Sequence, residues 1–274
     1  MFAKINHIAI ISANYTLLGQ FYEAVFAMQP PRKTRPGRAI TVGDGYVGLN
    51  INPRRAGRPA RLDHFGIQVE DVPTVFDRIR KQDPRVEWLQ RPSNRPFAGI
   101  TAHDPDGNVF DISQKDMKNR DAVYTEDDRQ QDRFINHVAL RTRRPELVAQ
   151  FYRDVFAFQL LNKAADDPNH YLSDGRITLE IMPWHITDFA GTGIESPGLD
   201  HIGFKVESID TFDKELTKLV RQNQYLAPNP LSRGEEGAAR LALFQRSCPL
   251  GTYHMSDSDG TLIDVSEQSA ARQG

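Results

Sequence analysis

Hydrophobic residues recur at helical spacing in two segments of this chain that are almost the same. The segments "LLGQFYEAVFAM" (17–28) and "LVAQFYRDVFAF" (147–158) each place apolar side chains on one face of a helix. Their shared part, residues 20–29 and 150–159, is identical at seven of ten positions, and the two copies lie 130 residues apart. The apolar stripes are Leu18, Phe21, Tyr22, Val25 and Phe26 in the first copy and Leu147, Phe151, Val155 and Phe158 in the second. The pattern therefore predicts one amphipathic helix that occurs twice.

A short apolar strand precedes each of these helices and carries a histidine. The strands "INHIAII" (5–11) and "INHVALR" (135–141) place His7 and His137 again 130 residues apart. Further along, "LDHFGIQVEDVPTVFDRIRK" from residue 62 and "LDHIGFKVESIDTFDKELTK" from residue 199 repeat the order of histidine-bearing strand and amphipathic helix. The repeated unit is therefore a strand and a helix, with a histidine in the strand.

Two similar turns close the pattern and define its halves. The segments "HDPDGNVFDIS" (103–113) and "DSDGTLIDVSE" (257–267) each predict a tight turn that leads into a strand. We predict an α+β protein of four βαβββ-like units, which begin near residues 5, 62, 134 and 199. They group into two tandem modules, 2–114 and 133–268, joined by a polar linker of mixed charge at 115–132. We expect each module to pack its copy of the repeated helix on its own sheet.

Alternation of side chains along these strands separates a core face from a face that carries the histidines. The residues that follow the four histidines are bulky, as core positions should be: Ile8, Phe65, Val138 and Ile202. Two positions after each histidine, on its own face, the residue is small, which should leave space above the sheet: Ala9, Gly66, Ala139 and Gly203. In the closing strands, Asp111 and Asp264 face away from their apolar neighbours.

Each module thus offers two histidines and one carboxylate. The sets are His7, His64 and Asp111 in the N-terminal module and His137, His201 and Asp264 in the C-terminal module. Two imidazoles and one carboxylate can bind one face of a divalent metal and leave other positions open for a substrate. This donor set suits Fe(II), Mn(II), Ni(II) or Zn(II). We therefore expect a divalent metal cofactor.

The composition changes this picture little. Of the 274 residues, 39% are hydrophobic and 26% charged, as in soluble globular proteins, and a net charge of −2 predicts no attraction to nucleic acid or to an anionic membrane. No apolar run is long enough for a membrane span, and the first residues lack a signal-peptide pattern. The single cysteine, Cys248, excludes an internal disulfide and suits a reducing cytoplasm. We expect a cytoplasmic protein that binds a small molecule; the sequence leaves open whether it forms a homo-oligomer.

Taken in order, these segments resemble the vicinal oxygen chelate superfamily, which includes glyoxalase I, bleomycin and fosfomycin resistance proteins and extradiol dioxygenases. The matching segments are "NHIAI", "FYEAVF", "DHFGIQV" and "DPDGNVFDI", then "NHVAL", "FYRDVF", "DHIGFKV" and "DSDGTLIDV". The resemblance spans nearly the whole chain. It implies paired βαβββ units that curl into a cup around a metal, with ligands on the first strand of each unit and on the last strand of the pair. Four units in one chain resemble the two-module extradiol layout.

The resemblance also implies a fourth ligand in one module. Glyoxalase I commonly has a glutamate on the last strand of its first unit, and Glu180 in "ITLEIMP" stands there in the C-terminal module. Asn50 stands at that place in the N-terminal module. The closing carboxylate of the family is usually Glu, whereas both modules here have Asp.

Extradiol enzymes keep a catalytic His and Tyr upstream of the closing carboxylate. Here Tyr253 and His254 precede Asp264, and both are candidates for catalysis, together with Glu180. No further histidine lies shortly before them, and Thr101 stands ten residues before Asp111. The oxygenase pattern is thus incomplete in both modules.

Three classes of function are consistent with these residues. They are a metalloenzyme acting on a small molecule with vicinal oxygens, a metal-free ligand-binding module of the resistance type, and a structural protein with a relict site; the retained histidines favour the first. Within it, His/His/Asp sets in both modules favour a ring- or C–C-cleaving dioxygenase with Fe(II), whereas Glu180 favours a glyoxalase-like lyase or isomerase. We expect the dioxygenase-like activity, and we expect it in the C-terminal cup because Glu180 and His254 lie there. The segment "PNPLSRGEEGAARLALFQ" (228–245) either covers a pocket as a lid or forms an ordinary surface excursion, and the sequence leaves both open.

Overall fold

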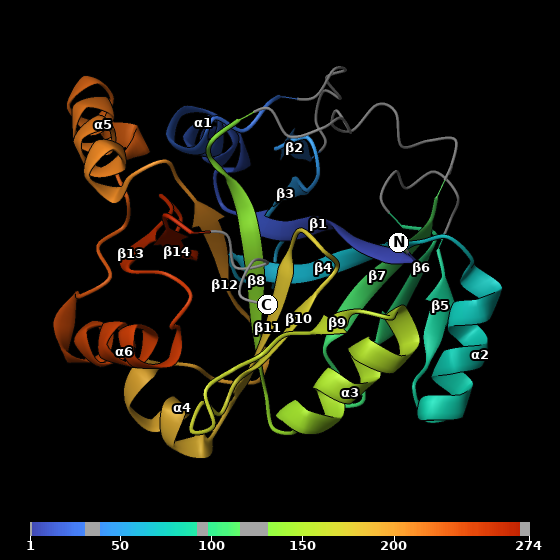
Figure 1. Ribbon diagram of the computed structural model, residues 1–274. Helices are drawn as coiled ribbons and strands as arrows, with labels where there is room; N and C mark the ends of the chain where they lie inside the picture. Colours follow the sequence, from blue (N-terminus) through green and yellow to red (C-terminus); the bar gives the residue numbers. More distant parts are fainter. Residues whose placement is uncertain (1, 31–38, 92–97, 116–130, 269–274) are drawn as a thin grey trace.

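The computed structural model describes residues 2–30, 39–91, 98–115 and 131–268, which form two mixed seven-stranded sheets flanked by helices (Figure 1). Sheet A contains β1 (Ala3–Ser12), β2 (Ile40–Gly43), β3 (Gly48–Pro53), β4 (Arg61–Val69), β5 (Trp88–Gln90), β6 (Ile100–His103) and β7 (Val109–Gln114). Sheet B contains β8 (Phe134–Thr142), β9 (Gln159–Leu160), β10 (His170–Ser173), β11 (Thr178–Pro183), β12 (Gly198–Lys205), β13 (Tyr253–Ser256) and β14 (Leu262–Ser266). The helices are α1 (Tyr15–Phe26), α2 (Val72–Gln82), α3 (Pro145–Phe156), α4 (Ile186–Thr192), α5 (Ile209–Gln222) and α6 (Gly234–Ser247), with a short 3-10 turn η1 (Gln224–Leu226). The predicted α+β class is confirmed.

The two sheets share the same strand order over most of their width. Sheet A has the order β2-β3-β1-β4-β7-β6-β5, and sheet B, read from its other end, has the order β9-β10-β11-β8-β12-β14-β13. Six strands of each sheet therefore correspond, as a tandem repeat requires. The modules differ between the second helix and the hairpin that closes the sheet, where the N-terminal module has β5 and the C-terminal module has η1 and α6, and the C-terminal module also adds β9 and α4.

The repeated helices α1 and α3 end in the same way. Each stops at an alanine in the left-handed conformation, Ala27 with φ 55° and Ala157 with φ 59°. At its start, α1 is capped by Asn14, whose side chain accepts a hydrogen bond from the amide of Leu17. Helix α3 instead begins with Pro145, whose fixed φ suits a first helical position.

The apolar stripes of α1 and α3 pack across the two modules as well as within them. Helix α1 contacts β1, β2 and β3 of its own sheet. Its Phe26 also stacks on Phe204 of β12 in sheet B, with ring centroids 3.9 Å apart. Reciprocally, Phe156 of α3 meets Phe110 of β7 in sheet A at 5.5 Å. Each helix packs on its own sheet, as expected. Its aromatic residues also pack on the other module, because they belong to a core that both modules share.

Polar contacts between the modules are also reciprocal. Oδ2 of Asp44 accepts a hydrogen bond of 3.0 Å from the amide of Ile135, and Oδ2 of Asp174 accepts one of 2.8 Å from the amide of Ile5. Each hairpin turn thus holds the first strand of the other module. The predicted linker, 115–132, lies almost entirely outside the described residues, so the module boundaries stay a prediction.

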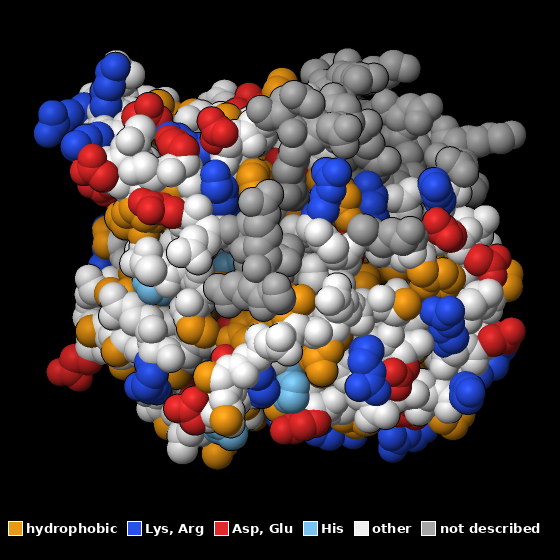
Figure 2. All heavy atoms as spheres, in the orientation of Figure 1, with side chains coloured by type: hydrophobic (Ala, Val, Ile, Leu, Met, Phe, Trp, Pro, Cys, Tyr) orange, Lys and Arg blue, Asp and Glu red, His pale blue; other side chains and the backbone are white. Residues whose placement is uncertain are grey.

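Lys, Arg, Asp and Glu side chains are interspersed over the face shown in Figure 2. This agrees with the small net charge of −2. Of the helices that the structure describes, none is both long and apolar enough to cross a membrane.

Candidate metal centres

Cross-strand pairing brings the histidines and aspartates of each module together. In sheet A, His7 on β1 pairs with Gly66 on β4, Gly66 pairs with Asp111 on β7, and Asp111 pairs with Thr101 on β6. The corresponding row in sheet B consists of His137, Gly203, Asp264 and His254. Paired residues lie side by side on one face of a sheet. The repeated strand order therefore builds the same cluster twice.

The small residues in these rows make room for the histidine ring itself. A Cβ atom at Gly66 would lie 2.0 Å from Cε1 of His7, and a Cβ atom at Gly203 would lie 1.9 Å from Cε1 of His137. The expectation that these two glycines leave space for a ligand above the sheet is wrong, because an imidazole from the neighbouring strand already covers each of them. Their role is to permit this close approach.

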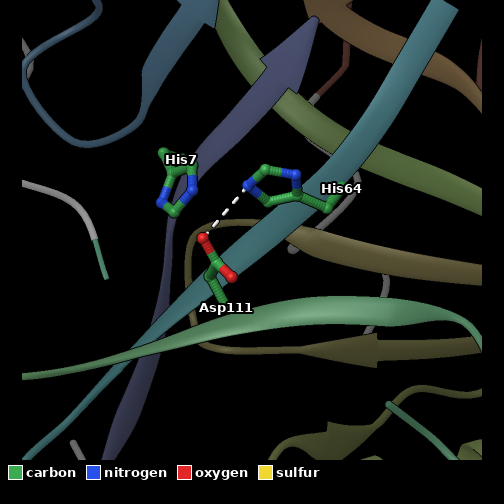
Figure 3. Close-up of side chains that lie close together, drawn as sticks. All are labelled: His7, His64 and Asp111. Atoms are coloured by element: carbon green, nitrogen blue, oxygen red, sulfur yellow. Dashed lines mark ion pairs between the residues drawn. The ribbon is translucent and has the colours of Figure 1, made fainter. Parts of the chain in front are cut away.

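The N-terminal cluster consists of His7, His64 and Asp111, which converge from β1, β4 and β7 (Figure 3). Their ligand atoms all lie within 4.8 Å of one another. Nε2 of His64 lies 3.1 Å from Oδ2 of Asp111. Oδ1 of Asp111 accepts a 2.6 Å hydrogen bond from Thr101 and lies 3.3 Å from the guanidinium of Arg91. Both carboxylate oxygens of Asp111 thus have partners within the protein.

The charges of this cluster are matched without a metal. Burial alone would lower the pKa of His64, but hydrogen bonds to Asp111 and Asp63 outweigh it and raise the pKa to about 9. Burial would raise the pKa of Asp111, but the hydrogen bond and charge of His64 lower it to about 2. At neutral pH the two groups form an ion pair, and a metal would have to displace the proton of His64.

The C-terminal cluster places more donors around one point. Ligand atoms of His137, Glu180 and His201 lie within 4.8 Å of one another. Nε2 of His137 is 3.1 Å from Nε2 of His201, which is 3.6 Å from Oε2 of Glu180. Oδ2 of Asp264 lies 3.5 Å from Nε2 of His137. The set predicted from the sequence, His137, His201 and Asp264, is therefore brought together, and Glu180 joins it from β11.

Both imidazoles of this cluster are oriented by the residue that precedes them. Nδ1 of His137 is 2.6 Å from Oδ1 of Asn136, and Nδ1 of His201 is 2.8 Å from Oδ1 of Asp200. These acceptors hold the ring proton on Nδ1 and leave the lone pair on Nε2. Two bare Nε2 atoms that face each other at 3.1 Å repel unless a proton or a cation lies between them. Burial would lower the pKa of His201, but hydrogen bonds to Asp200, Cys248 and Glu180 raise it well above its usual value, and burial lowers the pKa of His137. Without a metal, His201 therefore carries this proton, and a metal would take its place. This arrangement therefore suits a metal ion.

The carboxylates of the C-terminal cluster fit the same conclusion. Glu180 and Asp264 are 0% exposed, yet in the part of the chain that the structure describes no donor forms a well-aligned hydrogen bond with Oε2 of Glu180 or with either oxygen of Asp264. The backbone amides of Gly251 and Val265 lie near Asp264 and stabilise its charge only in part. Burial raises the pKa of Asp264 to about 7 and also raises that of Glu180. Buried carboxylate oxygens without partners are costly, and a divalent cation would satisfy all of them. The donors present thus fit a metal better here than in the N-terminal cluster.

Helix α6 covers the C-terminal cluster, which is one of the two arrangements that the sequence left open for this segment. The ring of Phe244 lies 4.9 Å from that of His201 and 4.7 Å from that of His254. Helices α4 and α6 pack together at this end of sheet B (Figure 1). All four donor side chains beneath α6 are 0% exposed.

The two further catalytic candidates on β13 face opposite sides of the sheet. His254 lies beside Asp264, with Nε2 3.5 Å from Oδ1. Tyr253 instead donates a 2.8 Å hydrogen bond to Asp213 on α5 and packs against Phe212 on the core side. Because adjacent residues of a strand point to opposite faces, Tyr253 lies outside the candidate site, and its assignment as a catalytic residue is corrected.

The sequence reasoning missed the residues that orient the histidines. Asn6, Asp63, Asn136 and Asp200 each contact Nδ1 of the histidine that follows them, at 2.6 to 2.9 Å. The signal was the dipeptide itself, Asn-His on the first strand of each module and Asp-His on the next histidine strand. Cys248 was also missed: its Sγ lies 3.8 Å from Nδ1 of His201. Burial raises the pKa of this thiol, which keeps it neutral.

The sequence of both modules matches a known protein family. The family model for the Glyoxalase/Bleomycin resistance protein/Dioxygenase superfamily matches residues 4–112 and 134–265. The chain belongs to this superfamily. Both matched regions contain one complete cluster, and the two-module organisation of this superfamily member follows from the double match. No curated protein sequence matches the chain.

Solved structures of this superfamily resemble the chain in fold. A Mn(II)-bound glyoxalase from Novosphingobium aromaticivorans has a TM-score of 0.63 and 16% identity, covering 97% of this chain and 82% of that one. A catechol 2,3-dioxygenase has a TM-score of 0.62 and 14% identity, covering 98% and 88%. An extradiol ring-cleaving dioxygenase from B. fuscum has a TM-score of 0.63 and 12% identity, covering 100% and 74%. At these identities the likeness concerns the fold alone.

Proposed function

We propose that this superfamily member is a divalent-metal-dependent enzyme that acts on a small molecule with two adjacent oxygen atoms, in the C-terminal cup. The proposal rests on one observation: His137, Glu180, His201 and Asp264 converge beneath α6 with carboxylate oxygens to which no described donor forms a well-aligned hydrogen bond. These four side chains would hold the metal. When bound, a divalent metal supplies Lewis-acid stabilisation of negative charge on a substrate oxygen.

The side chains around the metal supply the remaining parts of the chemistry. Asp200 and Asn136 keep the two imidazoles in the orientation that presents Nε2. Phe244 of α6 excludes water from the cluster. Glu180 has a pKa raised by burial, so it is suited to take a proton from a carbon next to a carbonyl group and return it.

The number of donors supports one of the two reaction classes. An ion held by these four protein donors and by two substrate oxygens would have no position left for dioxygen if it were six-coordinate. We therefore propose a lyase or isomerase that moves a proton, with Mn(II), Ni(II) or Zn(II), in place of the dioxygenase that the sequence favoured.

A dioxygenase is the second candidate, and the N-terminal cluster is what favours it. His7, His64 and Asp111 form a set of three donors, and Asn50 stands where the C-terminal module has Glu180. Three protein donors leave three positions open on an octahedral ion, as in oxygenases with two histidines and one carboxylate.

Metal analysis and two assays separate these candidates. Protein purified without oxygen is analysed for metals, then incubated with a panel of catechols to follow oxygen uptake and with 2-hydroxy ketones in D2O to follow deuterium exchange next to the carbonyl. We expect manganese, nickel or zinc, deuterium exchange and no oxygen uptake. Iron together with oxygen uptake would reject the lyase or isomerase and favour the dioxygenase.

Matched variants assign the proton transfer to one residue. Glu180→Gln keeps the shape of the side chain but cannot accept the proton, so deuterium exchange should be lost in protein that elemental analysis shows to retain the metal. Asn50→Ala changes the corresponding position of the other module and should leave exchange unchanged.

A further inference from the structure

Helix α6 stands between the C-terminal cluster and solvent. It occupies the place in the chain where the N-terminal module has β5, so it has no counterpart in that module. His137, Glu180, His201 and Asp264 are all 0% exposed beneath it. Neither a metal nor a substrate can reach these donors while every covering element keeps its position, and Phe244 of α6 packs directly on His201.

The middle of α6 is tied to a candidate metal ligand through one carboxylate. Arg240 of α6 donates a 2.7 Å hydrogen bond to Oδ2 of Asp200. Oδ1 of the same carboxylate is 2.8 Å from Nδ1 of His201. Arg141 of β8 also donates to Oδ2 of Asp200, at 2.7 Å. The position of α6 and the orientation of His201 thus share one buried anion.

The last turn of α6 is tied to the other side of the cluster. Oγ of Ser247 accepts a 2.8 Å hydrogen bond from Arg141. The carbonyl of Ser247 accepts a 2.8 Å bond from Nδ2 of Asn169, which also donates to Oε1 of Glu180 at 2.9 Å. Two of the four candidate ligands, Glu180 and His201, therefore share their hydrogen-bond partners with α6.

The N-terminal module provides an internal comparison. Asp63 orients His64 as Asp200 orients His201, with Oδ2 2.9 Å from Nδ1. The arginine bound to Asp63 is Arg58, which precedes β4, and its side chain is 51% exposed. Among the described residues, only the C-terminal module thus links the orienting aspartate to a helix that lies over the cluster.

We propose that α6 is a closure element that opens to admit metal and substrate, and that Arg240 is the positioning residue that links its closed position to the orientation of His201. The second half of this proposal rests on the metal site proposed above. Linkage is reciprocal, so a metal that needs His201 in its held orientation must also favour the closed position of α6. Loss of Arg240 should therefore weaken metal binding and also destabilise the closed position of α6.

Chemical modification of Cys248, the single cysteine of the chain, can measure the opening of α6. Cys248 follows α6, is 1% exposed and lies beneath the end of that helix. A thiol reagent can modify it only when this region opens, so the modification rate measures the open population. No further substitution is needed to create the probe.

The experiment compares wild type, Arg240→Gln, Arg240→Lys and Arg246→Gln, each with chelator and with Mn(II). Arg246 is an exposed residue of the same helix and serves as the matched control. With chelator, we expect R240Q to be modified about tenfold faster or more, because a hydrogen bond between charged groups is lost. R240K should be intermediate and R246Q unchanged.

Mn(II) tests the link to His201. We expect Mn(II) to slow modification of the wild type, and we expect R240Q to bind Mn(II) about tenfold more weakly. Equal modification rates for wild type and R240Q would overturn the closure. Faster modification of R240Q with unchanged Mn(II) affinity would overturn the link to His201. A wild type that binds no Mn(II), with R240Q still modified faster, would reject the proposed metal site but support the closure.

A folding control completes the test. Circular dichroism and thermal melting establish that each variant is folded before its thiol is modified. Should R240Q fail to fold, Ser247→Ala is judged by the same rates, because it removes the Arg141 contact to α6 without changing the charge.

Discussion

The imidazole of His137 fills the space in which a side chain at Gly203 would stand. A Cβ atom at Gly203 would lie 1.9 Å from Nδ1 of this ring, far below van der Waals contact. The ring therefore lies flat on the neighbouring strand, and its Nε2 is directed toward His201 at 3.1 Å. The geometry of the candidate metal centre depends on this glycine as much as on its ligands.

Substitution of Gly203 tests this dependence. Gly203→Ala should lower the free energy of unfolding by about 1–3 kcal/mol, as over-packing of a core does, and should weaken Mn(II) binding by displacing the ring. Gly191→Ala in α4 is the control, because nothing lies within 4 Å of a Cβ atom there. Urea unfolding and Mn(II) titration measure the two effects. Unchanged Mn(II) affinity in a destabilised G203A protein would contradict the role of the glycine.

The number of metal ions per chain should be one. In the N-terminal cluster, Thr101 and Arg91 already contact Asp111, whereas the carboxylates of the C-terminal cluster have unpaired oxygens. His201→Ala should therefore abolish metal binding, and His64→Ala should preserve it. Elemental analysis of both variants after dialysis against Mn(II) measures this. If His64→Ala loses the metal and His201→Ala keeps it, the site belongs to the N-terminal module.

The affinity of the protein for the metal should decrease as the pH is lowered. Burial raises the pKa of Asp264 to about 7, and a metal needs this carboxylate without its proton. Below pH ~7 the metal must displace the proton of Asp264 as well as that of His201, whose pKa its acidic neighbours raise well above the usual value, so the apparent Kd should rise more steeply with falling pH below ~7 than above it. Calorimetric titration with Mn(II) from about pH 5.5 to 8 measures the slope, and Asp264→Asn should remove the added steepness below pH ~7. A pH-independent Kd in the wild type would contradict the proton displacement.

The ion pair of the N-terminal cluster should make stability depend on pH in the alkaline range. The pKa of His64 is about 9 in the folded protein and 6.5 in its ordinary state. Its contribution is therefore complete below pH ~6.5 and is lost as pH rises through ~9, with an upper limit of about 3 kcal/mol. Urea unfolding with chelator at both ends of this range measures the loss.

His64→Gln provides the control for that measurement. It removes the titrating group, so its stability should change less than that of the wild type between these two pH values. Asp264 titrates in both proteins and cancels in the comparison. Parallel pH profiles of the two proteins would show that His64 contributes nothing to the pH dependence.

The fold and the ligand clusters could be predicted because the sequence pattern that encodes them occurs twice in the chain. A histidine strand followed by the same helix, 130 residues apart, predicts two similar sheets, and alternation along a strand predicts which face holds His7 or His137. The same rule excludes Tyr253 once His254 is assigned to the cup, because neighbours on a strand cannot share a face. Which of these two neighbours faces the cup needed the register of β13, which pairs His254 with Asp264.

What could not be predicted depends on contacts between distant segments. The apolar stripe of α1 indicates which face is buried, but not that Phe26 stacks on Phe204 of the other module. Helix α6 has no counterpart in the first module, so the repeat carries no information about where it lies. The roles of Arg240 and Asn169 depend on the position of α6, because Arg240 of this helix contacts Asp200 and Asn169 contacts Ser247 at its end, and both partners are far away in the sequence.

The reciprocal contacts of Asp44 and Asp174 have a consequence for assembly. Each module uses its hairpin turn and its aromatic helix to bind the other, in the manner of two subunits related by a twofold axis. The interface between the two modules of one chain thus resembles the interface that two copies of a single-module protein would form in a dimer. If the chain is divided between residues 115 and 131, each of the two fragments should expose the aromatic residues that pack between the modules. The fragments should regain the native structure only when they are refolded together.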